Sequence, residues 1–217
     1  MKVLGISDLH GLLPNIHDSV DICVICGDIS PLLLQHSPKK TKEWLGETFI
    51  PWTETIDCDH IFLISGNHDH VFAKHKQIVF KGTNITYLKD NKIEYKGYNI
   101  YGTPWCTQFG NWDFMLNSAK LKEQFSLIPE NLDLLITHDV PLNCNDVIIE
   151  DVKWKGKHIG NPELLQAIIN KKPKNLCCGH LHGSDHTPTK FYNTIVRQCS
   201  LVNEQYKLAY KPQIFEI

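Results

Sequence analysis

Five short apolar runs along the chain each end in polar side chains of the kinds that bind metal ions. The runs cover residues 2–7, 22–26, 60–65, 134–137 and 175–178. Runs of this length that are rich in Val, Ile and Leu are typical of buried strands. In an α/β sheet, the loops that leave the carboxyl ends of the strands form the ligand crevice. We therefore expect the five following loops to converge on one site.

Three further strands are expected at 93–95, 98–101 and 194–198, with Lys96-Gly97 as a tight hairpin turn between the first two. Helices are expected where a capping Ser or Asn precedes proline or a helix-forming segment. They run from Ser37-Pro38 toward Phe49, over 118–125 behind Asn117, and onward from Asn161-Pro162. This mixture predicts a mixed sheet or two packed sheets with helices outside. Because no repeat or linker is visible, we expect one domain over 1–217.

The composition is that of an ordinary soluble globular protein, since 42% of the 217 residues are hydrophobic, 21% are charged and the net charge is −2. Phosphate binding needs a Lys/Arg footprint, and the chain has no long basic run, so duplex nucleic acid is not an obvious partner. No signal peptide opens the chain, and no apolar stretch approaches the roughly 20 residues of a spanning helix. We expect a cytoplasmic protein without a membrane segment; its oligomeric state is left open.

The eight cysteines lie mostly in or beside the predicted strands. Cys23-x-x-Cys26 has the spacing of a redox or zinc pair. Three residues apart in a strand, however, the two side chains point to opposite faces. We therefore favour buried, reduced thiols that pack as small hydrophobic side chains.

The loops after the apolar runs contain a repeated ligand spacing. Asp8-x-His10 and His180-x-His182 each place two ligand types on one side of an extended segment. Asp, Asn and His are also common in turns, which accounts for one or two such loops but not for all five. The loops between these two motifs add Asp28, Asn67, His68, Asp69 and His138.

This donor set narrows the choice of metal. Carboxylate, amide and imidazole donors without an obvious cysteine suit Mn, Fe, Zn, Ni or Co better than Ca or Mg. The candidates outnumber the four ligands of a structural zinc, so two divalent metal ions are expected. Two ions about 3.5–4 Å apart can share a bridging carboxylate and a bridging hydroxide, and can stabilise both oxygens of an in-line displacement at phosphorus.

In this order the motifs resemble those of the calcineurin-like metallophosphoesterases, from residue 2 to at least residue 182. They are Asp8-x-His10, Gly27-Asp28, Gly66-Asn67-His68-Asp69, His138 and Gly179-His180-x-His182. Residues 100–105 and the C-terminal third are also similar to the small metallophosphoesterase-domain branch typified by the brain 239 protein. The resemblance implies an α/β fold, a four-layer αββα sandwich of two mixed β-sheets flanked by helices.

The resemblance also implies a role for each motif residue. His68 would stabilise the phosphoryl charge or protonate the leaving oxygen, and Asp69 would orient the His68 ring. Some members of the branch have glycine where this chain has His182, so a fuller metal site and better catalysis are expected here. One metal would be held by Asp8, His10, Asp28 and His182, and the second by the bridging Asp28 with Asn67, His138 and His180.

The implied activity is hydrolysis of a small phosphoester, and a phosphodiesterase acting on cyclic nucleotides or aryl diesters is favoured. The alternatives are a phosphomonoesterase and, from another class, a metal-supported interaction module without catalysis. Such modules usually lack part of the ligand set, which is complete here. Several side chains keep two interpretations. Trp105, Phe109 and Trp112 either form a wall of the substrate site or belong to the core. Asp139 either adds negative charge near a metal or is a turn residue, and His70 and His186 either line the pocket or lie in solvent-facing loops.

Overall fold

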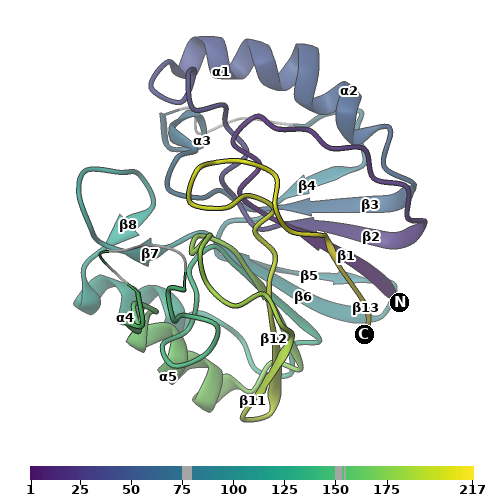
Figure 1. Ribbon diagram of the computed structural model, residues 1–217. Helices are drawn as coiled ribbons and strands as arrows, with labels where there is room; N and C mark the ends of the chain where they lie inside the picture. The colour runs from purple at the N-terminus through teal and green to yellow at the C-terminus, as the bar shows by residue number, and fades with distance from the viewer. Residues whose placement is uncertain (75–79, 150–152, 154) are drawn as a thin grey trace.

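The computed structural model describes residues 1–74, 80–149, 153 and 155–217. Two mixed sheets pack face to face in it, and helices cover both outer faces (Figure 1). The first sheet has the order β13-β1-β2-β3-β4, in which β1 to β4 are parallel and β13 pairs antiparallel with β1. Its strands are β1 (Lys2–Ile6), β2 (Val20–Ile25), β3 (Cys58–Leu63), β4 (Ile85–Tyr87) and β13 (Gln213–Glu216).

The second sheet has the order β11-β12-β10-β9-β6-β5. Its four inner strands are parallel, and each outer strand pairs antiparallel with its neighbour. Its strands are β5 (Asn91–Tyr95), β6 (Tyr98–Thr103), β9 (Leu134–Thr137), β10 (Asn175–Cys178), β11 (Thr189–Phe191) and β12 (Thr194–Gln198). A separate parallel pair is formed by β7 (Cys106–Thr107) and β8 (Met115–Leu116).

The helices divide between the two outer faces. Those near the first sheet are α1 (Pro38–Trp44), the π-helical segment η1 (Leu45–Phe49), α2 (Ile50–Thr53) and α3 (His70–Lys74), and those under the second sheet are α4 (Ser118–Ser126) and α5 (Pro162–Lys171) (Figure 1). The three expected helices are confirmed, and the first continues past Phe49 to Thr53 through its π-helical middle. The eight expected strands are also present, with ends shifted by up to two residues.

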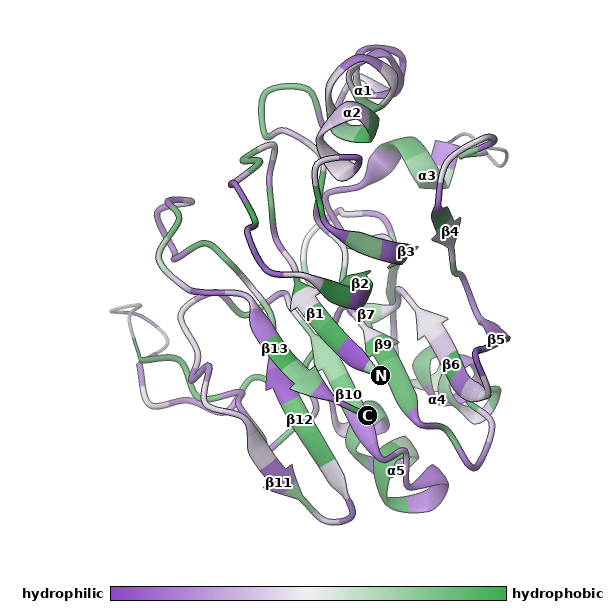
Figure 2. Cartoon of the chain, turned by 90° about the vertical axis from the view of Figure 1, so that its right-hand side faces the viewer, coloured by the Kyte–Doolittle hydropathy of each residue, from purple (hydrophilic) through white to green (hydrophobic). Residues whose placement is uncertain are grey.

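Side-chain alternation along the strands produces three apolar layers. Val3 on β1 joins the layer between the sheets, whereas the next residue, Leu4, joins the outer layer under α1, η1 and α2. Leu134 and Leu135 on β9 divide in the same way between the middle layer and the layer under α4 and α5. Figure 2 shows the corresponding hydrophobic colour along the central strands. The expected αββα sandwich is therefore confirmed.

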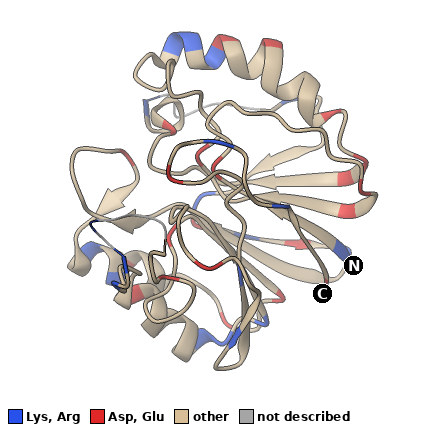
Figure 3. Cartoon of the chain, viewed as in Figure 1, with Lys and Arg blue, Asp and Glu red and all other residues tan. Residues whose placement is uncertain are grey.

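The surface carries charges of both signs. Figure 3 shows basic and acidic residues interspersed along α1 and over the helices of the opposite layer, which is the distribution of an ordinary solvated surface. Within the described ranges, none of the helices has the length and apolar character needed to cross a bilayer.

Candidate metal centre

Four of the predicted ligand residues have a left-handed backbone conformation. The φ angles are 55° at Asp8, 45° at His10, 54° at Asp28 and 68° at His180. Asp8 and His10 follow β1, Asp28 follows β2 and His180 follows β10. A non-glycine residue in such a conformation costs of order 1–3 kcal/mol and persists where the surrounding structure requires it, commonly at functional sites. The strands therefore end in strained turns that present these side chains.

The first group of ligand atoms comes from Asp8, His10 and His182. His182 Nε2 lies 3.2 Å from Asp8 Oδ1 and 3.4 Å from His10 Nε2. His10 Nε2 lies 4.0 Å from Asp8 Oδ1 and 3.8 Å from Asp28 Oδ2. All three side chains are buried, and the motifs they come from are at opposite ends of the chain. The structure thus brings together the residues assigned to the first metal.

The second group centres on His138. Its Nε2 lies 3.3 Å from Asp28 Oδ2 and 3.1 Å from Asn67 Oδ1. Its Nδ1 donates to the Cys26 carbonyl at 2.7 Å, which directs the other ring nitrogen toward the site. The His180 ring lies 5.0 Å from the His138 ring, centroid to centroid. Because Asp28 Oδ2 faces both His10 and His138, it occupies the position expected of a bridging carboxylate.

The spacing of these donors fits divalent cations. Ligand atoms 2.0–2.2 Å from an ion lie about 3–3.5 Å from one another in tetrahedral or octahedral coordination. Three distances between donor atoms fall in that interval: 3.2 Å from His182 to Asp8, 3.4 Å from His182 to His10 and 3.3 Å from His138 to Asp28. Carboxylates and imidazole nitrogens so placed, away from solvent, need a positive charge between them.

The pKa values of the ligand residues show how strongly the buried carboxylates attract positive charge. Burial alone would raise the pKa of Asp28, but the nearby histidines, His138 first, hold it well below its usual range. Burial would lower the pKa of His138, yet the charges of Asp28 and Asp8 raise it to about 10. At His10 burial prevails and lowers the pKa to about 4. Asp28 is therefore ionised and His10 neutral, as metal ligands must be, whereas His138 holds a proton that a bound cation would displace.

The second group also contains a cysteine that was not among the predicted ligands. Cys106 Sγ lies within 4.8 Å of ring nitrogens of both His138 and His180. It comes from β7, directly after Trp105, and is fully buried. No local signal marks Cys106, because β7 is a two-residue strand whose position depends on its packing.

The partner of His68 differs from the prediction. Its Nδ1 hydrogen-bonds to Gln35 Oε1, and its Nε2 points toward Asp28 Oδ2 at 4.0 Å. The expectation that Asp69 orients the His68 ring is wrong. Gln35 lies 33 positions earlier, in a loop without a recognisable motif, so sequence pattern alone could not identify it.

Asp69 instead holds the backbone of two ligand loops. Its carboxylate accepts hydrogen bonds from the amides of Asp28 (2.8 Å), Ser30 (2.9 Å) and Gly66 (2.9 Å). A further bond comes from the Ser30 hydroxyl at 2.6 Å. Burial, followed by the charge of Asp28, raises the pKa of Asp69 to about 6. Asp69 therefore positions the loops after β2 and β3 rather than acting on a ring.

Gly66 is required by this close approach. A Cβ at this position would lie 2.2 Å from Asp28 Oδ1 and 2.5 Å from His138 Cε1. Gly179 is restricted in the same way, since its Cβ would lie 2.4 Å from Asp8 Oδ2. The glycines of two motifs thus make room for the ligand side chains of other loops.

The ligand groups open into a hollow of ≈ 380 Å³, which we call the metal hollow. Aromatic rings form its wall. Centroid to centroid, the Trp112 ring lies 4.2 Å from the His68 ring, and the Tyr206 ring lies 4.8 Å from the His10 ring. Among the described residues, the lining includes Asp28, Leu32, Gln35, Asn67, His68, Phe109, Trp112, His180, His182, Glu204 and Tyr206. Phe109 and Trp112 thus take the wall position considered for them, whereas Glu204 and Tyr206 come from a C-terminal loop that the sequence analysis left unassigned.

Trp105 lies elsewhere. Its Nε1 donates to Asp90 Oδ2 at 2.7 Å, and its ring packs 5.7 Å from Phe114, centroid to centroid. It packs against two of the apolar layers and is absent from the residues lining the metal hollow. The substrate-binding role considered for Trp105 is therefore replaced by the core interpretation.

The remaining undecided residues also have defined contacts. Asp139 accepts from the Thr107 amide (2.8 Å) and from Asn161 Nδ2 (2.8 Å), so it connects the loop after β9 to β7 and to the start of α5. His70 pairs with Asp113 at 2.6 Å beside Trp112, behind the wall of the metal hollow. His186 bonds to the His182 carbonyl at 3.1 Å and supports that ligand from outside.

The sequence is similar to those of several curated proteins. The chain is 36% identical over 137 residues to a UPF0046 protein of Caenorhabditis elegans, covering 62% of this chain and 33% of that protein. It is 29% identical over 208 residues to Metallophosphoesterase domain-containing protein 1 of Homo sapiens, covering 83% and 60%. The chain therefore spans less than two thirds of the length of these relatives.

Solved structures agree in fold. One crystal structure aligns with a TM-score of 0.67 and 16% identity, covering 91% of this chain and 89% of the other. The phosphopantetheinyl hydrolase of Mycobacterium tuberculosis aligns with a TM-score of 0.54 and 12% identity, covering 94% and 90%. The family model described as calcineurin-like phosphoesterase matches residues 1–184, which include every predicted ligand. The chain thus belongs to the calcineurin-like phosphoesterase family.

Proposed function

We propose that this chain hydrolyses phosphodiesters with the help of two divalent metal ions. The observation that carries the proposal is the pair of donor groups that share Asp28 and open into one hollow beside His68. Asp8, His10, Asp28 and His182 would hold one ion, and Asp28, Asn67, His138 and His180 the other. Mn, Fe, Zn, Ni and Co all suit this donor set.

When bound, the two ions would supply an activated water and neutralise charge on the phosphoryl group. The chain's own residues would position the substrate and protonate its leaving oxygen. Gln35 accepts from His68 Nδ1, so His68 Nε2 is directed into the metal hollow. When the ring is doubly protonated, Nε2 can give its proton to the leaving oxygen and leave the neutral ring with its proton on Nδ1. The rings of Trp112 and Tyr206 lie beside His68, with centroids 4.2 and 6.5 Å from its own, and border this position.

The preference for a diester is supported by the space around His180. A second hollow, of ≈ 360 Å³, adjoins the metal hollow and shares Phe109, His180 and Glu204 with it. A phosphate bound at these ligands would have one of the two hollows available to each of its substituents. A monoester would use only one of these two spaces.

The test combines metal analysis of the purified protein with turnover of bis(p-nitrophenyl) phosphate and p-nitrophenyl phosphate in added manganese. We expect metal-dependent hydrolysis that is faster for the diester. Asp28→Asn should lose both metal and turnover. His68→Ala should keep its metal and lose about 10²–10⁴-fold in turnover, the usual contribution of a positioned acid.

His17→Ala is the matched control, because His17 is exposed and outside the metal hollow. It should match the wild type in both measurements. Absence of metal-dependent hydrolysis of either ester would contradict the proposal, and so would full turnover by His68→Ala.

A further inference from the structure

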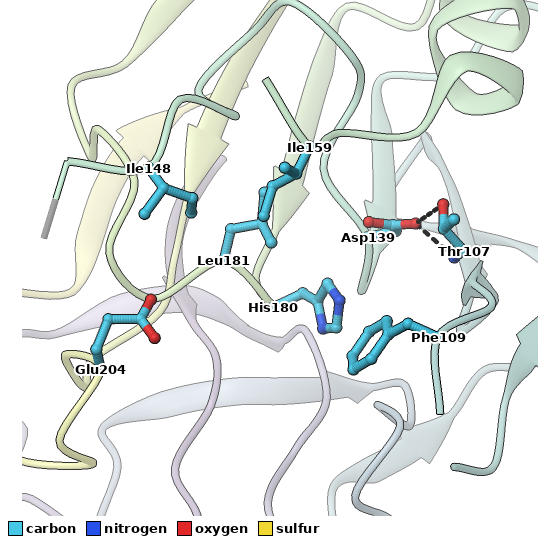
Figure 4. Close-up of a pocket in the computed structure, with 8 residues that line it drawn as sticks. All are labelled: Thr107, Phe109, Asp139, Ile148, Ile159, His180, Leu181 and Glu204. Carbon is cyan, nitrogen blue, oxygen red and sulfur yellow. Dashed lines mark hydrogen bonds between the residues drawn. The ribbon is translucent and has the colours of Figure 1, made fainter. Parts of the chain in front are cut away.

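The hollow that adjoins the metal hollow has a chemistry of its own, and we call it the side hollow. Figure 4 shows its lining side chains, which come from several loops and surround the His180 ring. Of the described residues that line it, four are apolar, namely Phe109, Ile148, Ile159 and Leu181. A space of ≈ 360 Å³ with such walls is large enough for an organic substituent of modest size.

Among the described residues of the side hollow, Asp139 and Thr107 are engaged with the protein. Asp139 Oδ2 accepts from the Thr107 amide, the Thr107 hydroxyl and Asn161 Nδ2, and its Oδ1 accepts from the Val140 amide. Figure 4 shows the two bonds from Thr107. The carboxylate is thus satisfied within the fold, and the side hollow offers a substituent mainly apolar contact.

Glu204 gives the side hollow a negative border. Its Oε1 accepts from the Gly183 amide at 2.7 Å, and the side chain borders both hollows. A second anion on the substituent would therefore meet a fixed carboxylate in a partly enclosed space. Repulsion of like charges under these conditions disfavours anionic groups.

His180 and Phe109 connect the side hollow to the reacting centre. The His180 ring lies 5.0 Å from the His138 ring on one side and 5.5 Å from the Phe109 ring on the other. Phe109 is 50% exposed and lines both hollows. A group attached to a phosphate at the metal ligands can therefore extend past His180 into the side hollow.

We propose that the side hollow binds an uncharged aryl or alkyl substituent of the phosphodiester and disfavours an anionic one. This inference rests on the function proposed above and specifies its substrate class. Each methylene group that enters the side hollow should tighten binding by about fourfold, from the usual free energy of apolar burial. A phenyl group should bind at least tenfold more tightly than a methyl group.

The experiment measures binding rather than turnover. Methylphosphonate, phenylphosphonate and 4-carboxyphenylphosphonate are titrated calorimetrically into the manganese-loaded protein, and the Kd ratios are compared on the same preparation. Such a ratio does not depend on the fraction of active protein. We expect phenylphosphonate to bind most tightly, and Glu204→Gln to bring the 4-carboxyphenyl compound closer to it while keeping an oxygen for the Gly183 amide.

Two filling variants locate the substituent. Ile159→Trp fills the side hollow and should reduce the phenyl-to-methyl ratio to near one. Leu32→Trp fills the metal hollow instead, and this variant should keep the wild-type phenyl-to-methyl ratio. Ile195→Trp is the matched control, because Ile195 is 37% exposed on β12 and lines neither hollow.

A wild-type ratio near one would overturn the inference, and so would a ratio that falls in Leu32→Trp but not in Ile159→Trp. These outcomes leave the phosphodiesterase proposal standing if bis(p-nitrophenyl) phosphate is still hydrolysed. Loss of that hydrolysis in the unmodified protein would instead refute the proposed function.

Discussion

At the scale of single residues, the contact between Gln35 and His68 determines how the proposed acid is presented. The Gln35 carbonyl oxygen can only accept, so His68 Nδ1 carries a proton and Nε2 faces the metal hollow. An amide partner adds no charge next to Asp28, which already faces His68 at 4.0 Å. Gln35 is thus a positioning residue that acts through His68.

Replacement of Gln35 tests this role. Gln35→Leu removes the acceptor and should lower kcat by about ten- to a hundredfold, with metal content and KM nearly unchanged. Gln35→Glu keeps an acceptor oxygen and should recover much of the loss. Steady-state kinetics together with metal analysis measure both effects. Equal kcat in Gln35→Leu and wild type would show that the contact does not position His68.

At the scale of elements, the two long helices begin with the same cap in different surroundings. The Asn117 side chain accepts from the Lys120 amide at the start of α4, and that of Asn161 accepts from the Leu164 amide at the start of α5. Asn161 is fully buried and also donates to Asp139 at 2.8 Å, whereas Asn117 is exposed. The start of α5 is therefore tied to the loop that carries His138.

This difference predicts unequal costs for the same substitution. Asn117→Ala should lower the free energy of unfolding by about 1 kcal/mol, the usual value of a cap. Asn161→Ala should lower it by about 2–3 kcal/mol, because the buried Asp139 carboxylate also loses a donor. Urea denaturation of both variants measures the difference. Equal costs would mean that the bond from Asn161 to Asp139 contributes nothing measurable.

At the scale of the whole molecule, the three apolar layers share strands and join the two ends of the chain. β13 pairs with β1, and the Met1 amino group donates to the Ile217 carbonyl at 3.0 Å, so the termini lie side by side (Figure 1). The eight cysteines are unpaired, and Cys58 alone among them is only half-buried. Seven of them lie in these layers, and Cys106 lies beside the metal ligands His138 and His180. We therefore expect residues 1–217 to unfold as one domain.

Thiol reactivity tests this expectation. Burial raises the pKa of Cys23 and Cys199 well above the usual value and that of Cys58 to about 11, so these three thiols are scarcely ionised at pH 8. Burial would also raise the pKa of Cys177, but hydrogen bonds with Cys199 and Cys26 lower it; this thiol is fully buried and out of reach of the reagent. Ellman's reagent should react slowly with the native protein and with all eight thiols after denaturation. Across a guanidinium series the thiols should become reactive in a single transition. Several fast thiols in the native protein, or two separate transitions, would contradict this.

Much of the fold could be predicted because it is recorded in short stretches of chain. The apolar runs of β1, β9 and β10 and the cap before α5 are local patterns, and each forms the expected element. The strands β4, β7, β8, β11 and β13 were not predicted. They have two to four residues each, and their extended conformation depends on the partners to which they bond.

The sequence by itself determined which side chains are available for metal chemistry and that they follow strands, because ligand type and apolar periodicity are properties of neighbouring residues. Only the tertiary structure decided their partners. It placed Gln35 rather than Asp69 against His68, gave Trp105 to the core, and brought Tyr206 over the metal hollow. The reason is physical: each of these contacts joins loops far apart in the chain, and their distance in space is set by the packing of the two sheets.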